Sequence, residues 1–155
     1  MIYLIKWKKL IISILIPNIL GLFGSLIGNV MDGFDGINKP SFTPSSILFP
    51  IVWVILYTLM GISTYLISES NNGDSRDALF IYGIQLIINV LWTYFFFNLK
   101  WFLFSFILVL IILLLVIIMI RKFYNINKLS AYLQIPYVIW LIFAAILSFN
   151  VFLLN

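Results

Sequence analysis

Five long apolar stretches, separated by short polar connections, make up almost all of this 155-residue sequence. A helix needs about 20 apolar residues to cross the hydrocarbon layer of a bilayer, and each stretch is close to that length. Hydrophobic residues form 64% of the chain and charged residues only 9%, whereas a soluble domain carries roughly 25% charged residues. The sequence therefore predicts an all-α membrane protein, a five-transmembrane-helix bundle, with residues 1–155 in one transmembrane domain.

The polar residues between the apolar stretches define the limits of the spans. The spans are expected at residues 10–30, 45–67, 79–97, 101–120 and 130–154. The longest connection, residues 32–44, contains the helix breakers Gly36 and Pro40, and residues 121–129 form a polar, basic connection. The first apolar stretch follows three lysines, as in a signal peptide, but it is too long for a cleaved segment. We therefore expect it to be retained as the first helix.

Loop charges predict how the chain crosses the membrane. Five spans put the two ends of the chain on opposite sides. The side of the N-terminus then carries Lys6, Lys8, Lys9, Arg76, Arg121, Lys122 and Lys128, and the other side carries Lys39 and Lys100. Basic residues concentrate in cytoplasmic loops, so we expect the N-terminus in the cytoplasm and the C-terminus outside. The abundance of Ile, Asn and Lys indicates an AT-rich bacterial genome, and hence a bacterial plasma membrane.

The composition also limits the chemistry of the protein. The chain has no cysteine and no histidine, which excludes disulfides and the zinc ligands, haem ligands and general bases that these residues supply. All five acidic residues lie in connections or at span ends, so we expect no metal site and no acid–base catalytic group within the membrane. The basic residues do not cluster on a solvated face, so the lipid bilayer and not nucleic acid is the expected partner.

Polar, aromatic and small side chains recur at helical spacing on three of the spans. They are Trp53, Tyr57, Met60, Gly61 and Thr64 on the second span, Gln85, Asn89, Trp92 and Phe96 on the third, and Tyr137, Trp140, Ala144 and Ser148 on the fifth. Residues three and four apart share one helix face, and a buried amide in hydrocarbon needs a hydrogen-bond partner. These faces are therefore expected to point into the bundle. There they either join helices, which is the simpler interpretation of Asn89 alone, or line an aromatic pocket for a planar ligand.

The first span carries small residues where another helix can approach closely. Gly24 and Gly28 form a GxxxG pair, a spacing typical of close helix contact in membranes. We favour packing within the chain over a seam between two copies of it.

Three sets of residues follow the order and spacing of a known family over nearly the whole chain. The first is Lys39-Pro40, Pro44, Phe49, Val52-Trp53, Leu56-Tyr57 and Met60-Gly61; the second is Gln85-Leu86, Asn89, Trp92 and Phe95-Phe96; the third is Pro136-Tyr137, Trp140, Phe143-Ala144 and Leu154-Asn155. In these motifs the chain resembles the tryptophan-rich sensory protein / translocator protein family, also called TspO/MBR or the peripheral-type benzodiazepine receptor family.

The resemblance implies a five-helix bundle, usually a homodimer, with a ligand pocket beneath the first extracellular loop. The family binds porphyrins such as protoporphyrin IX and haem, and some members bind sterols or benzodiazepine-type ligands. No cofactor is required, and porphyrin is the expected ligand. The candidate ligand-binding residues are Phe34, Pro44, Phe49, Trp53, Tyr57, Gln85, Asn89, Trp92, Tyr137, Trp140, Ala144 and Ser148.

The chain departs from the family pattern mainly in the loop that covers the pocket. Gly33-Phe34 stand where the family usually has Trp-Tyr, Phe42 replaces a Trp, and Ser45 replaces the second Pro of a pair. On the fifth span, Ser148 replaces the usual Asn. The loss of indole and phenol groups from this loop predicts weaker ligand binding and weaker photochemistry, without a change of fold.

Three functions are consistent with these observations. The first is a membrane receptor with a sensory or regulatory role that binds a tetrapyrrole. The second is an enzyme that degrades porphyrin under light, in which the resemblance implicates Trp53 and Trp140; no other catalytic residue is expected. The third, a transporter of porphyrins or other lipophilic metabolites, is disfavoured because the sequence has neither internal repeats nor spans interrupted near the midplane.

Overall fold

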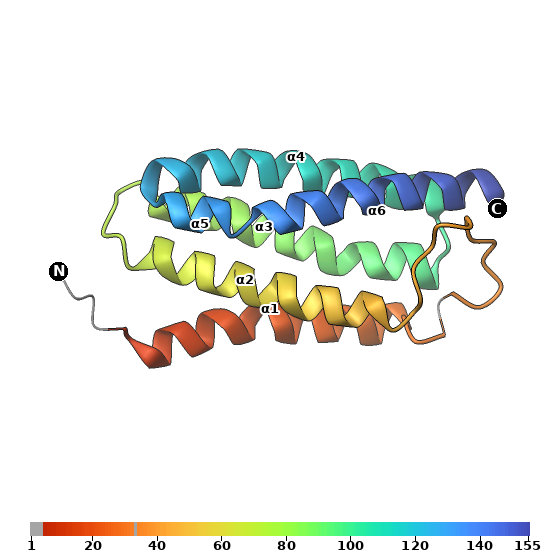
Figure 1. The fold of residues 1–155 in the computed structure, drawn as a ribbon, viewed down its shortest axis with the longest axis horizontal. Coiled ribbons are helices and arrows are strands. Elements are labelled where there is room, and N and C mark those ends of the chain that lie inside the picture. Colours follow the sequence, from red (N-terminus) through yellow and green to blue (C-terminus); the bar gives the residue numbers. More distant parts are fainter. Residues whose placement is uncertain (1–4, 33) are drawn as a thin grey trace.

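The protein is a bundle of long helices that lie roughly along one direction, with the start of α1 and the end of α6 at opposite ends of the bundle (Figure 1). The computed structural model describes residues 5–32 and 34–155. Its helices are α1 (Trp7–Gly28), α2 (Leu48–Ser68), α3 (Ser75–Thr93), the π-helical turn η1 (Tyr94–Asn98), α4 (Phe102–Ile126), α5 (Lys128–Tyr132) and α6 (Ile135–Leu154). The described residues form no strand. Gly33, where the sequence departs from the family pattern, lies outside the described residues.

Five segments are long and apolar enough to cross a membrane, which confirms the predicted fold class. They are Trp7–Ile27, Leu48–Ser68, Ser75–Asn98, Phe102–Ile126 and Lys128–Leu154. The last of these comprises α5 and α6, which are separated by a short turn before Ile135. The protein is therefore an all-α integral membrane protein.

The predicted connection at residues 121–129 was wrong, because most of it is helical. The fourth helix continues six residues beyond the predicted end, to Ile126. Charged residues such as Arg121 and Lys122 are good helix formers, and no glycine or proline occurs between them and Pro136. The helix ends where Asn127 adopts an extended backbone, and the side chain of Asn127 caps the next helix by accepting a hydrogen bond from Ser130 N at 3.1 Å. In the same way, α3 begins at Ser75 and not at residue 79.

Helices α1 and α4 lie on the outside of the bundle, on either side of α3. Helix α1 lies against α2 and α3, while α4 lies against α3 and α6, so α1 and α4 flank the bundle (Figure 1). On α4, side chains three and four apart are buried along one face, namely Val109, Ile112, Val116, Met119 and Phe123. The opposite face of α4 is apolar and exposed, as a helix in lipid requires.

Small residues bring α1 close to its neighbours. A Cβ atom on Gly61 of α2 would lie 2.4 Å from Ile14 Cα on α1, so only glycine permits this crossing. Gly24 and Gly28 lie against α3, where Thr93 Oγ1 donates a hydrogen bond of 2.8 Å to Gly24 O. The GxxxG pair therefore packs within the chain, which confirms the favoured interpretation.

The loop between α1 and α2 is tied to the C-terminus. Asn38 N donates to Asn155 Oδ1 at 3.0 Å, and Asn155 Nδ2 donates to Asn38 O at 2.9 Å. Asn38 Nδ2 also donates to Leu154 O at 3.2 Å. These bonds hold the loop over the end of the bundle where α6 finishes. We call this the Asn155 end, and we call the opposite end, where α2 finishes, the Glu69 end.

Candidate functional site

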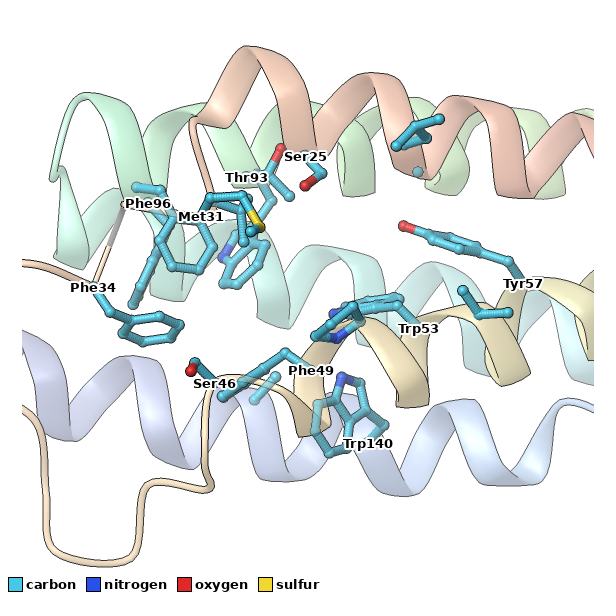
Figure 2. A pocket seen from close by; sticks show the side chains of 18 of the residues that line it. Ser25, Met31, Phe34, Ser46, Phe49, Trp53, Tyr57, Thr93, Phe96 and Trp140 are labelled. Carbon is cyan, nitrogen blue, oxygen red and sulfur yellow. The ribbon is translucent and has the colours of Figure 1, made fainter.

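A cavity of about 440 Å³ lies near the Asn155 end of the bundle. It is enclosed by α1, the loop after it, α2, the region around the α3–η1 junction, and α6 (Figure 2). Its lining is predominantly apolar, with a few polar groups. This volume and this lining are typical of small-molecule sites.

Aromatic rings form the walls of the cavity. Trp53 stacks on Tyr57 with ring centroids 5.2 Å apart and lies edge-on to Trp140 at 6.4 Å. Phe49 lies edge-on to Trp140 at 5.8 Å, and on the α3 side Trp92 stacks on Phe96 at 5.1 Å. The labelled side chains of α2 and α6 meet on one side of the space, opposite those of α1 and α3 (Figure 2). Flat walls of this kind suit a planar, apolar ligand.

Eight of the twelve candidate residues line this cavity. They are Phe34, Phe49, Trp53, Tyr57, Trp92, Trp140, Ala144 and Ser148. Ser148 and Tyr57 are buried, and the two tryptophans Trp53 and Trp140 are half-buried with their rings turned toward the bundle. The tertiary structure thus brings together residues from three helices and the covering loop.

The other four candidates do not line the cavity. Pro44 lies in the covering loop before α2, away from the lining. Gln85, Asn89 and Tyr137 are only 0%, 2% and 1% exposed and lie behind the cavity wall. Direct contact between these four residues and a ligand stays a prediction.

The buried amides and phenols form one chain of hydrogen bonds across three helices. Tyr57 Oη donates to Asn89 Oδ1 at 2.8 Å, and Asn89 Nδ2 donates to Tyr137 Oη at 3.0 Å. Tyr137 Oη in turn donates to Gln85 Oε1 at 2.9 Å. Asn89 therefore joins α2, α3 and α6. This agrees with the simpler interpretation of its sequence position, in which Asn89 holds helices together. Because Tyr57 also lines the cavity, the chain begins at the cavity wall.

One polar group in the lining has no partner of its own. The indole Nε1 of Trp92 is buried, and no acceptor within the described residues lies at hydrogen-bond distance. A buried N–H group is costly to leave unpaired.

Part of the cavity wall comes from α1, which the sequence motifs did not indicate as part of the site. Asn18, Gly21 and Ser25 line the cavity together with Thr93 of α3. A Cβ atom on Gly21 would lie 2.1 Å from Cε2 of the Tyr57 ring, so Gly21 makes room for Tyr57. The run of small residues around Gly24 was the available signal, but it was interpreted only as a packing surface.

The rim of the cavity is exposed on the side of α1 and α2. Leu22, Met31, Ile47, Pro50 and Val54 contribute to the lining and are all exposed. In a bilayer, the sides of α1 and α2 face lipid. The cavity is therefore accessible to a lipophilic molecule dissolved in the membrane.

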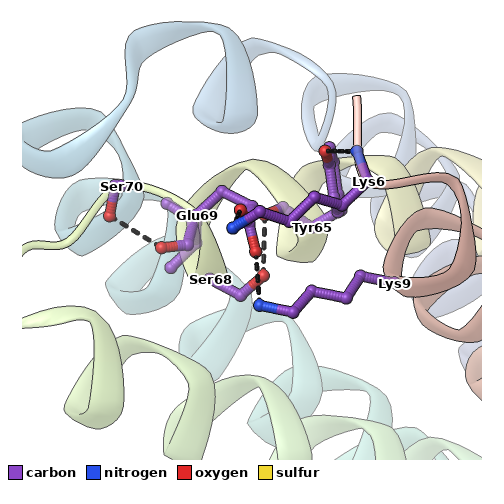
Figure 3. Close-up of polar contacts among 7 residues, drawn as sticks. Lys6, Lys9, Tyr65, Ser68, Glu69 and Ser70 are labelled. Carbon is purple, nitrogen blue, oxygen red and sulfur yellow. Dashed lines mark hydrogen bonds and ion pairs between the residues drawn. The ribbon is translucent and has the colours of Figure 1, made fainter. Parts of the chain in front are cut away.

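The Glu69 end is held by an ion-pair cluster (Figure 3). Lys6 Nζ lies 2.6 Å from Glu69 Oε2, and Lys9 Nζ lies 2.7 Å from Glu69 Oε1. Hydrogen bonds from Lys6 and Lys9, which outweigh the other influences, lower the pKa of Glu69, and the hydrogen bond and charge of Glu69 raise the pKa of Lys6. The backbone N–H of Lys6 also donates to Tyr65 Oη at 3.0 Å. The start of α1 is therefore anchored to the end of α2.

Comparison with known proteins places this arrangement in a family. The model of the TspO/MBR family matches residues 13–154. A tryptophan-rich protein TspO of Archaeoglobus fulgidus is 34% identical over 95% of this chain and 97% of its own length. A tryptophan-rich sensory protein of Cereibacter sphaeroides is 32% identical over 79% of this chain and 76% of its own. A translocator protein of Sus scrofa is 29% identical over 94% of this chain and 89% of its own.

Proposed function

Since this chain belongs to the TspO/MBR family of membrane proteins with a sensory or regulatory role, we propose that its ligand is a tetrapyrrole held in the aromatic cavity. The observation that carries the proposal is the set of aromatic walls around a space of about 440 Å³: Trp53 and Trp140, edge-on to each other, form one side, and the stacked rings of Trp92 and Phe96 lie on the α3 side. A porphyrin macrocycle is planar and apolar over both faces, and aromatic side chains stack on such faces favourably.

The polar groups around the cavity support a ligand with carboxylates at its edge. Trp92 lines the cavity, and its buried Nε1 has no hydrogen-bond partner among the described residues. Lys39 Nζ lies 5.2 Å from the ring centroid of Phe34, which lines the cavity, so a positive charge lies close to one of the lining residues. Protoporphyrin IX carries two propionate groups, and the positive charge of Lys39 would attract such a group.

Titration with protoporphyrin IX tests the proposal. We expect quenching of tryptophan fluorescence in the purified protein, and at least tenfold weaker binding in the double variant Trp53→Phe, Trp140→Phe, because two stacking indoles are lost. Trp101→Phe is the matched control: Trp101 is 55% exposed and lies outside the cavity lining, so this variant should bind as the wild type does. Unchanged affinity in the double variant would contradict the assignment of the ligand to this cavity.

A second candidate function is light-dependent oxidation of the bound porphyrin by dioxygen. It is favoured by the presence of both indoles at the cavity wall, where Trp53 and Trp140 would contact an excited macrocycle. Illumination of the complex with and without dioxygen tests it. Product formation no faster than that of free porphyrin under the same light would exclude this function and leave the binding proposal intact.

The orientation and assembly of the protein are also part of the proposal. The basic residues of the Glu69 end favour a cytoplasmic N-terminus, which places the cavity toward the outer half of a bacterial plasma membrane. The family resemblance supports a homodimer.

A further inference from the structure

Four hydrogen-bonding atoms in the bundle core, on the Glu69 side of the cavity, lack partners. They are Gln85 Nε2, Tyr82 Oη, and both Nε2 and Oε1 of Gln134, and none has a hydrogen-bond partner in the part of the chain that the structure describes. Gln85 and Gln134 are 0% exposed, and Tyr82 is 8% exposed. Buried polar groups are nearly always satisfied by protein or by ordered water. A group of four such atoms therefore requires an explanation.

The residues that carry these atoms come from α3 and from the turn before α6. Helices α3 and α6 run in the same direction (Figure 1), and Tyr137 joins them by its 2.9 Å bond to Gln85. Tyr82 precedes Gln85 by one helical turn, and Gln134 precedes Tyr137 by one turn. Tyr82 and Gln134 therefore both lie on the Glu69 side of the Tyr137–Gln85 contact.

Helix α2 bounds the same region from the other side. Ser130, one turn before Gln134, exchanges two hydrogen bonds with Ser63: Ser63 Oγ donates to Ser130 O at 2.8 Å, and Ser130 Oγ donates to Ser63 O at 3.1 Å. Ser63 and Ser130 are both 0% exposed. Gln134 lies in the turn between α5 and α6 and is itself 0% exposed, so its side chain lies in the interior of the bundle.

The hydrogen-bond chain that starts at the cavity points toward these atoms. Every donor in it is aimed the same way, from Tyr57 to Asn89, from Asn89 to Tyr137 and from Tyr137 to Gln85. The next donor is Gln85 Nε2, and the unpartnered Gln134 Oε1 is an acceptor. A water molecule accepts from one such group and donates to another, and a buried water needs two to four polar partners.

We propose that Tyr82, Gln85 and Gln134 form an internal water-binding site, which extends the hydrogen-bond chain from the cavity wall at Tyr57 toward the Glu69 end. Its ligand is one or more ordered water molecules. The site is separate from the cavity, because none of these three residues lines it. It also requires no bound ligand in the cavity, so its test is independent of tetrapyrrole binding.

Single substitutions distinguish a hydrated site from a dry one by the sign of their effect. In a hydrated site, Tyr82→Phe removes a partner of the water and should lower the unfolding temperature by about 2–4 °C. In a dry site, the same change removes a costly unpaired hydroxyl and should raise that temperature. Ser105→Ala is the matched control, since Ser105 Oγ is buried and unpartnered near the Asn155 end, and its removal should not lower the unfolding temperature.

A double variant and a direct observation complete the test. Gln134→Leu should also lower the unfolding temperature, and Tyr82→Phe with Gln134→Leu should lower it by less than the sum, because both changes disrupt the same water. If Gln134→Leu does not fold, Gln134→Met takes its place.

A crystal structure of the full chain in a lipid mesophase, at a resolution that shows ordered water, should place a water within hydrogen-bond distance of Gln85 Nε2 and Gln134. A higher unfolding temperature for Tyr82→Phe, or a direct Gln85–Gln134 bond with no water between, would overturn the proposal.

Discussion

Tyr57 takes part in two environments at once. Its ring lines the cavity and stacks on Trp53, while its hydroxyl donates to Asn89 behind the wall. Asn89 is the central member of the buried chain, because it accepts from Tyr57 and donates to Tyr137. In a bundle surrounded by lipid, bulk water does not replace a lost partner of these side chains.

Replacement of Asn89 by alanine should therefore destabilise the fold. The change leaves the Tyr57 hydroxyl without an acceptor and removes the donor to Tyr137, and each buried unsatisfied group costs about 1–3 kcal/mol. We expect the free energy of unfolding in detergent to fall by about 2–4 kcal/mol. Asn125→Ala, at an exposed asparagine of α4, is the control and should change it by less than about 0.5 kcal/mol. Equal stability of the two variants would refute a structural role for the chain.

The Glu69 cluster predicts how stability depends on pH. The pKa of Glu69 is lowered from 4.5 by hydrogen bonds from Lys6 and Lys9, so its contribution is present above pH 4.5 and is lost as the pH falls through the folded-state pKa below that value. The pKa of Lys6 is raised from 10.5, so its contribution is present below pH 10.5 and is lost as the pH rises through the folded-state pKa above that value.

Thermal unfolding measured from below pH 4.5 to above pH 10.5 tests the contributions of both Glu69 and Lys6. The unfolding temperature should decrease at each extreme, and Glu69→Gln should reduce both decreases, because the lysines then lack their anionic partner. Salt should weaken the effect, since these side chains are solvent-accessible. Identical pH profiles for the variant and the wild type would show that the cluster does not contribute.

At the scale of helices, α1 is the element whose position depends most on small residues. Gly61 permits the crossing of α1 and α2, and Gly21 makes room for the Tyr57 ring between them. Pro17 lies within α1 and leaves Ser13 O without its usual helical donor, and this oxygen would be only 2.6 Å from a Cβ atom on Gly61. The cavity wall formed by α1 therefore depends on these contacts.

Gly61→Ala should destabilise the bundle and displace α1. Its added methyl group would meet backbone atoms of Ile14, which cannot move aside as a side chain does, and overpacking of this kind costs about 1–3 kcal/mol. Gly83→Ala is the matched control: it lies within α3 with no atom of the described residues within 4 Å of the added methyl group, so it should stabilise the protein by about 0.5–1 kcal/mol. Denaturant titration of both variants measures the difference, and a stabilising effect of Gly61→Ala would contradict the crossing geometry.

At the scale of the whole molecule, the two ends of the bundle differ in chemistry. The Asn155 end has the aromatic cavity and a loop tied to the C-terminus, whereas the Glu69 end has the ion-pair cluster and most of the basic residues. The buried polar chain lies between them. The proposed ligand site therefore lies at only one end of the bundle.

The absence of cysteine permits a direct test of the predicted orientation. A single cysteine in place of Ser41, an exposed residue of the covering loop, should react with a membrane-impermeant maleimide on intact cells. A cysteine in place of Arg121, exposed near the α4–α5 junction, should react only after the cells are opened. The reverse pattern would show that the N-terminus is outside.

The sequence by itself determined the five spans, their helical character and the inward direction of their polar faces. These features depend on hydropathy and on the helical repeat, which are local properties of the chain. The sequence did not determine the end of α4 at Ile126. Residues 121–126 include several polar residues, which predicted a connection, but none of them breaks a helix. Only the tertiary structure decided which inward side chains line the cavity, as Trp53 and Trp140 do, and which pair behind it, as Asn89 does. It also decided that α1 forms one wall. Those outcomes depend on how closely the helices cross, and that distance is set by contacts such as Gly61 with Ile14, between residues far apart in the chain.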